Sequence, residues 1–267
     1  MRPIGLTILC SVFLLSGFGP LLLPRSPLEI DLDRRLQGPS LTYPFGTDHL
    51  GRCLLSRIID GAPRTIGIAL LTQGIALAIG MGVGMVSGYH GGRIDFFLMR
   101  LTEMTMAFPS LVLSLAIIAL LGPGTHNAMI AFALVHWAFY ARLIRGLVIE
   151  IKGRSFIEAA MALGVSPSRM VLRHYLPNIF PPVAILASLD TGRVIFALSG
   201  LGFLGLGAQP PTPEWGAMLN EGRLFLTQAP HLVLFPGVAI LITVMGFNLI
   251  GEGSIRGRGE ISIIHRD

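Results

Sequence analysis

The amino-acid sequence predicts an all-α membrane protein whose chain crosses the bilayer about six times. Hydrophobic residues make up 52% of the 267 residues and charged residues only 13%, and the mean hydropathy is +0.69. Long charge-free runs recur along the chain, and about 20 apolar residues in a helix are enough to cross a hydrocarbon core of roughly 30 Å. This composition is far from that of a soluble globular domain.

The charge-free runs give the order of the helices, which we expect at residues 4–23, 66–86, 96–121, 128–149, 179–201 and 231–251. The first run is longer than a signal sequence needs and ends in Pro24-Arg25 without a small-x-small cleavage site, so we expect it to stay as a helix. The third and fourth helices are separated by a turn signal, Gly122-Pro123-Gly124-Thr125. Residues 24–65 would then form an outer loop. Residues 252–267 would form a flexible tail, since four glycines lie in the nine residues 251–259.

Basic residues predict which side of the membrane each loop occupies. With the N-terminus inside, the inner segments hold twelve Lys and Arg residues and the outer segments hold seven. Under the positive-inside rule, both termini and the polar loop between the fourth and fifth helices lie in the cytoplasm. The sequence pI of about 9.9 then reflects this inner basic surface, and no aromatic–basic module indicates a nucleic-acid partner.

The loop between the fourth and fifth helices has the pattern of two short helices joined by a break. Ser155 and Glu158 have the S-x-x-E spacing of a capping box. Gly164 can take the left-handed conformation that ends a helix, and Ser166 followed by Pro167 can begin the next. Capping alone also fits a plain surface connection. A compact helix pair on the basic side is, however, suited to docking a soluble partner.

The same loop resembles the EAA loop of ATP-binding cassette (ABC) importer permeases. Glu158-Ala159-Ala160 is followed after three residues by Gly164, and nine further residues lead to His174, three before Pro177. The ending His174-Tyr175-Leu176-Pro177-Asn178 is similar to that of the dipeptide, oligopeptide and nickel branch. In that family the loop, here residues 153–177, holds coupling helices that fit into clefts on the ATPase subunits. The resemblance implies an ATPase-coupling role for Glu158, Ala159, Ala160, Gly164, Arg169, His174 and Pro177.

Further stretches extend the resemblance to the C-type permease subunits over nearly the whole chain. They are residues 45–52, residues 88–95, and residues 203–207 with Pro213-Glu214-Trp215-Gly216. Cys53 stands where Asp is usual, and residues 251–259 replace the usual Gly-Asp-x-Leu-Arg-Asp type of segment. The second departure puts in doubt any contact between this tail and an ATPase.

The resemblance implies a type I ABC importer permease, with residues 66–251 as its transmembrane core, in the lipid of a bacterial inner membrane. The chain holds a single lysine, Lys152, and no G-x-x-x-x-G-K-[ST] run, so it lacks a phosphate-binding P-loop of its own. We therefore expect no catalytic residue and no cofactor in this chain, with ATP and Mg held by two separate ATPase subunits. A homologous second permease would complete the pathway. An external binding protein would deliver cargo to an outer mouth near Glu214 and Trp215.

Charged side chains inside predicted helices are candidates for the cargo path, because burying a charge in a membrane is costly. Asp190 and Arg193 lie near the middle of the fifth helix with i, i+3 spacing, which fits either a functional site or a mutually neutralising pair. His136 lies in the fourth helix and is either a ligand or a helix–helix hydrogen bonder. Glu103 is the fourth candidate, although it is placed to pair with Arg100 and do nothing more.

These positions favour nickel, as the free ion or a chelate, over a dipeptide or oligopeptide. Peptide permeases commonly carry Glu at the position of Leu198 and lack an acidic residue at the position of Asp190. The surroundings of Asp190 and His136 are more similar to those in the nickel-permease C subunit. Nickel accepts nitrogen and oxygen ligands, so His136 and Asp190 would make transient contacts without forming a stable metal site.

Two other classes of protein are alternatives. An ion-coupled secondary transporter often shows an inverted internal repeat, and none is evident between residues 1–125 and 126–267. A membrane-embedded hydrolase needs a clustered nucleophile and base or a metal group, which the scattered His126, His136 and His231 do not supply.

Overall fold

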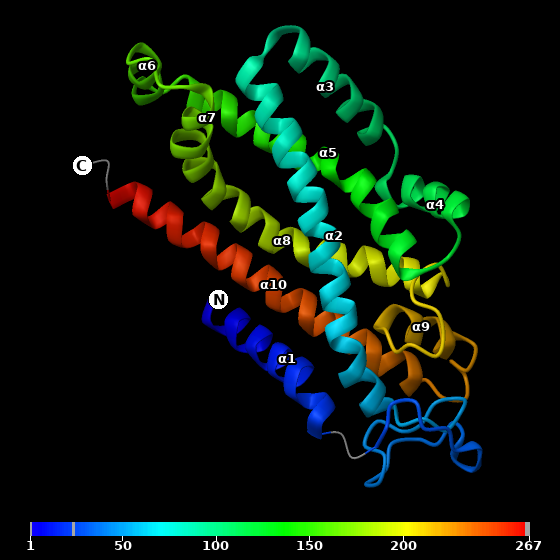
Figure 1. Ribbon diagram of the computed structural model, residues 1–267. Helices are drawn as coiled ribbons and strands as arrows, with labels where there is room; N and C mark the ends of the chain where they lie inside the picture. Colours follow the sequence, from blue (N-terminus) through cyan, green and yellow to red (C-terminus); the bar gives the residue numbers. More distant parts are fainter. Residues whose placement is uncertain (1, 23–24, 265–267) are drawn as a thin grey trace. The chain divides into compact units, whose positions relative to one another are not determined.

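The computed structural model describes residues 2–22 and 25–264, and the part it describes is helical without a named strand. Figure 1 shows the helices in chain order. They are α1 (Arg2–Leu22), η1 (Leu32–Arg34), α2 (Leu54–His90), α3 (Gly92–Met106), α4 (Ser110–Leu121), α5 (Thr125–Lys152), α6 (Ser155–Ala162), α7 (Pro167–Met170), the π-helical turn η2 (Val171–Tyr175), α8 (Leu176–Phe203), α9 (Trp215–Arg223) and α10 (His231–Ile264). The predicted all-α class is confirmed.

Five of these helical stretches are long and apolar enough to cross a membrane: α1, α2, α5, the run Pro167–Phe203, and α10. A sixth span exists if α3 and α4 are counted together, although the two helices meet at 87°. The expectation of one continuous third helix over residues 96–121 is therefore wrong. The break falls at Ala107-Phe108-Pro109, because a proline disfavours the helical conformation of the residue before it.

Two predicted boundaries also differ from the structure. α2 begins at Leu54, so the outer loop ends well before residue 65, and Pro63 lies inside the helix. The charged residues near the start of α2 lower its hydropathy, so the charge-free run begins later than the helix. The structure pairs Arg57 with the distant Glu221, and Arg64 with Asp60 one turn earlier. α10 continues through Ile264, so the segment expected to be a flexible tail from residue 252 is helical as far as that residue.

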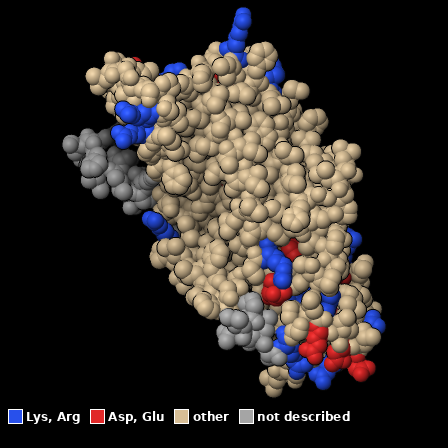
Figure 2. Space-filling model, viewed as in Figure 1, with Lys and Arg blue, Asp and Glu red and all other residues tan. Residues whose placement is uncertain are grey.

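The chain divides into two compact units. The first contains residues 1–71, 117–130 and 188–267, and the second contains residues 72–116 and 131–187. In the first unit α1 lies along α10, as Figure 1 shows, and the two backbones come close where Gly5 faces Gly246. Figure 2 shows Asp, Glu and Arg side chains gathered over the loop that precedes α2, in contrast to the largely uncharged surface elsewhere in that view.

In the second unit, glycines on one face of α2 bring it into close contact with α5. Gly80, Gly84 and Gly88 recur every four residues, the spacing that lets membrane helices approach closely. A Cβ atom on Gly84 would lie 2.5 Å from the carbonyl oxygen of Ala141 and 2.9 Å from Cβ of Ile144. A Cβ atom on Gly82, on the other side of the helix, would meet nothing within 4 Å. The close α2–α5 contact therefore depends on the missing side chains.

We expect Gly84→Ala to destabilise the protein by ~1–3 kcal/mol, because the added methyl group overpacks a backbone contact that has no flexible neighbour to yield. Gly82→Ala is the matched control, with the same change of helix propensity in open space. Thermal unfolding in detergent compares the two variants. An equal melting temperature for both would show that the glycine face is not a close-packed contact.

Candidate coupling surface and cargo cavity

The loop between α5 and α8 forms two short helices joined by a break, as the sequence predicts. α6 ends at Ala162, and Gly164 takes a φ of +74°, a left-handed conformation that favours glycine. α7 begins at Pro167 and leads through η2 directly into α8. Gly164 thus turns the chain between α6 and α7.

The capping predicted for these helices is wrong in detail. Arg154 occupies the N-cap position of α6 and Ser155 is already its first helical residue, so no side-chain cap bond forms and the capping box with Glu158 is absent. The carbonyl oxygen of Arg154 instead accepts hydrogen bonds from the backbone N–H groups of Ile157 and Glu158. Ser166 does stand at the N-cap of α7, with Pro167 first in the helix, but its hydroxyl makes no cap bond.

One side of this loop is packed against the second unit's core. Ile157, Ala160, Met170 and Tyr175 are buried in one apolar cluster with α2 and α5 residues such as Val148. Of the residues to which the resemblance assigns a coupling role, Ala160 therefore faces inward. Glu158, Ala159, Gly164, Arg169 and Pro177 are exposed, and His174 is half-buried.

The other side exposes large apolar side chains. Phe156 is 41% exposed, Met161 44%, Leu163 84% and Leu172 64%. We call these four residues with the exposed Glu158 the coupling surface. Large apolar side chains exposed on short helices that also carry basic residues are typical of a surface for protein contact.

Polar contacts tie α5 to its neighbours behind the coupling surface. The Arg145 guanidinium binds the Asp95 carboxylate through two bonds, Nε to Oδ1 at 2.5 Å and Nη2 to Oδ2 at 2.6 Å, and Ser87 donates to the same carboxylate. The Lys152 ammonium donates to the carbonyl oxygen of Tyr89 at 2.8 Å. These bonds join α5 to α2 and α3, so the loop and the three helices form one packed body.

In the first unit, Glu214 and Trp215 are buried rather than open to solvent. Glu214 is 6% exposed and caps α9: its Oε1 accepts from the Gly216 N–H and its Oε2 from the Ala217 N–H, both at 2.9 Å. Trp215 is 2% exposed and donates from Nε1 to the carbonyl oxygen of Ile58. The expectation that both residues line an open mouth is therefore wrong for Trp215, whose buried ring packs against α2.

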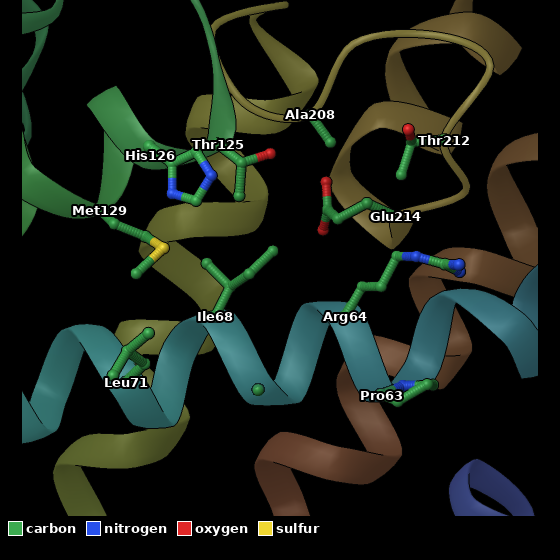
Figure 3. A pocket seen from close by; sticks show the side chains of 11 residues that line it. Pro63, Arg64, Ile68, Leu71, Thr125, His126, Met129, Ala208, Thr212 and Glu214 are labelled. Carbon is green, nitrogen blue, oxygen red and sulfur yellow. The ribbon is translucent and has the colours of Figure 1, made fainter.

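Glu214 does face a cavity. The cavity has a volume of about 410 Å³ and is lined from α2 by Arg64 and Ile68, from the start of α5 by Thr125 and His126, and by Glu214 before α9 (Figure 3). Thr65 donates to Glu214 Oε1 at 3.1 Å. Burial raises the pKa of the Glu214 carboxyl, and the hydrogen bonds from Gly216, Ala217 and Thr65 oppose that rise. Volumes of roughly 300–1,000 Å³ are typical of small-molecule sites.

The first unit also contains a buried network of ion pairs. None of its residues is among the site candidates predicted from the sequence. Arg52 binds Asp48 through Nε at 2.6 Å and Glu221 through Nη2 at 2.9 Å. Arg57, 1% exposed, binds Glu221 at 3.0 Å and lies 3.5 Å from Asp48. From the sequence, Asp48, Arg52 and Arg57 count only as charges of an outer loop. Their partner Glu221 is too distant along the chain for any local signal to find it.

The network also contains the one group in the described chain that has the composition of a metal site. Asp48, His49 and Glu221 bring potential ligand atoms within 4.8 Å of one another. Both carboxylates are already neutralised by Arg52 and Arg57, so a cation would have to displace an arginine from each. The arrangement favours a structural role: it holds the loop before α2 against α9.

Comparison with known proteins agrees with the helical membrane fold. Residues 80–256 match the family model described as "binding-protein-dependent transport system inner membrane component". The chain belongs to this family. It is a membrane-embedded permease subunit of the ABC importer class.

The permease is similar to several curated proteins over most of its length. It is 43% identical over 250 residues to the dipeptide transport system permease protein of Alkalihalophilus pseudofirmus, which covers 94% of this chain and 82% of the relative. It is 42% identical over 246 residues to the probable D,D-dipeptide transport system permease protein of Escherichia coli K12, covering 92% of this chain and 83% of the relative. It is 39% identical over 230 residues to the nickel transport system permease protein of the same strain, covering 86% of this chain and 83% of the relative.

The fold of the permease is shared with a solved transporter. A chain in an inward-facing structure of the MetNI methionine ABC transporter superposes with a TM-score of 0.62 at 18% identity, covering 76% of the permease and 97% of that chain. The predicted type I importer fold is confirmed at this level.

The candidates for the permease's cargo path belong to different elements of the two units. His136 belongs to the second unit, where its ring stacks on Phe132 and Phe139 at centroid distances of 5.1 and 5.6 Å. Asp190 belongs to the first unit and is 3% exposed, whereas Arg193, one turn later, is exposed. Glu103 pairs with Arg100 at 3.2 Å on an exposed face, as its spacing predicts.

Proposed function

We propose that the permease forms, with a homologous second permease, the membrane pathway of an importer powered by two separate ATPase subunits. The observation that carries this proposal is the coupling surface, which exposes Phe156, Met161, Leu163 and Leu172 from helices whose opposite side is packed on α2 and α5. Closure of the ATPases on ATP and Mg would push on this surface. Because the loop, α2, α3 and α5 are bonded together, they would move as one body.

We propose a short peptide as the cargo, delivered by an external binding protein. The two relatives at 43% and 42% identity are named for dipeptides. Nickel, free or as a chelate, is the second candidate, supported by the nickel permease at 39% identity and by the nitrogen and oxygen donors of His136 and Asp190.

Uptake by the complete transporter in proteoliposomes tests both parts. We expect labelled dialanine to accumulate only with the ATPase subunits and ATP present, and unlabelled dialanine to compete with radioactive nickel if both use the pathway. Uptake driven by an ion gradient in vesicles without ATPases would instead support a secondary transporter.

We further propose that the permease lies in the bacterial inner membrane with both termini and the coupling surface in the cytoplasm. The excess of basic residues on that side supports this orientation. In a C10S background, cysteines introduced at the exposed Ser168 and Ser40 report the two sides. A membrane-impermeant maleimide added to intact cells should label position 40 and spare position 168. The reverse pattern would invert the topology and remove the coupling role.

A further inference from the structure

The cavity of Figure 3 presents side chains of opposite charge. Glu214 contributes a carboxylate that is almost fully buried. Arg64 lines the same cavity from α2, with its guanidinium group directed away from Glu214 toward Asp60. The rest of the lining is largely apolar or hydroxyl-bearing, with Ile68 and Met129 among its members. A largely apolar site with a few charged groups selects ligands by their charge pattern.

Glu214 retains capacity for one more donor. A carboxylate offers about four acceptor positions. Oε1 uses two, for the Gly216 N–H and the Thr65 hydroxyl, and Oε2 uses one, for the Ala217 N–H. One acceptor position of Oε2 is thus left for a ligand, and an ammonium group there would offset the cost of the buried charge.

Arg64 also retains free capacity. Its Nη1 group donates to the carbonyl oxygen and carboxylate of Asp60, four residues earlier on α2. No hydrogen bond from its Nε or Nη2 occurs within the described residues. The pair is partly exposed, with 41% of the Arg64 side chain accessible, and exposed pairs of this kind are weak. The guanidinium can therefore turn to a ligand carboxylate, which it would hold through two parallel hydrogen bonds.

We infer that this cavity is a transit site for a zwitterion, in which Arg64 binds the carboxylate and Glu214 the ammonium group of an unmodified short peptide. The inference rests on the proposed function and adds the place where the cargo's charged ends are recognised. A bare divalent cation fits this cavity poorly, because the Arg64 guanidinium repels it and His126 and Glu214 are the only nitrogen and carboxylate ligands that the lining contributes. A transit site must also release its cargo, and recognition by only two charged side chains suits that need.

Protection of a cavity cysteine from a thiol reagent tests the inference directly. Thr212 lines the cavity and is exposed, so T212C in a C10S background provides the reporter. In the assembled transporter without its binding protein, we expect dialanine to slow labelling, whereas dialanine amide, which lacks the carboxylate, does not. R64Q should raise the dialanine concentration needed for protection at least about tenfold.

Arg223→Gln is the matched control, since Arg223 is an exposed arginine of the same unit that does not line the cavity. It should leave protection unchanged. Equal protection by dialanine and its amide, no protection by either, or unaltered protection in R64Q would each overturn the inference. If the parent takes up dialanine with ATP but shows no protection, the inference fails and the proposed function stands. If protection occurs without ATP-driven uptake, the proposed function fails and the site stands.

Discussion

Arg57→Met will lower the stability of the permease by ~3–5 kcal/mol, the cost typical of removing one partner from a buried ion pair. Arg57 is 1% exposed and its guanidinium contacts both Glu221 and Asp48. Methionine fills much of the same volume but leaves Glu221 with only Arg52 as a neutralising partner. The expected result is a sharp fall in the melting temperature and in the amount of folded protein recovered in detergent.

Arg35→Met is the control for this variant. Arg35 lies in the same loop region but is exposed, and its side chain donates a hydrogen bond from Nε to the His49 carbonyl oxygen at 2.9 Å. We expect its melting temperature to stay close to that of the parent. If Arg57→Met were as stable as Arg35→Met, the network would not be what holds the loop against α9.

The double variant Arg57→Met with Glu221→Leu should recover part of the lost stability, because both buried charges are then removed together.

Leu163→Asp will reduce transport-coupled ATP hydrolysis and cargo uptake by at least about tenfold, the effect of losing a central apolar anchor in an interface. Leu163 is 84% exposed and lies between α6 and Gly164, so the change leaves the packed core untouched. A carboxylate at this position would have to be desolvated when an ATPase docks. ATP hydrolysis and uptake by the reconstituted complex, with the subunit composition checked by gel, measure the effect.

Leu41→Asp makes the same chemical change at a fully exposed leucine in the loop before α2, and we expect wild-type coupling from it. Wild-type hydrolysis and uptake in Leu163→Asp would show that the ATPases engage another surface.

Gly164→Val would act in the same direction as Leu163→Asp, since a β-branched residue is strained at a φ of +74° and would misplace α7 relative to α6.

The features that could be predicted are those that depend on residues close together in the sequence. Apolar runs locate the spans because a helix crosses the bilayer only if it is long and apolar enough, and both properties are local in the sequence. The break at Gly164 is equally local, since a single glycine supplies the left-handed conformation. The order Glu158-Ala159-Ala160-Gly164 resembles the EAA loop and so points to the family, which the family model confirms.

The features that could not be predicted depend on partners far along the chain. Hydropathy places the start of α2 at residue 66, because Arg57 is typical of a loop until its distant partner Glu221 is known. The capping box is a wrong prediction because the helix begins one residue earlier than the pattern assumes. Pro109 marks the break between α3 and α4 in the sequence, but the 87° angle between the two helices is set by their packing.

The amino-acid sequence by itself determined that this is a helical membrane permease whose polar loop is broken at a glycine, because hydropathy, glycine breaks and a short spaced motif act within a few turns of helix. Only the tertiary structure decided which charges are structural and which face a cavity. Arg57 and Arg64 lie seven residues apart on one helix. Arg57 is buried in an ion pair with Glu221, whereas Arg64 lines the cavity that Glu214 also lines. That difference arises from α9 folding back on α2, a contact between residues more than 140 positions apart.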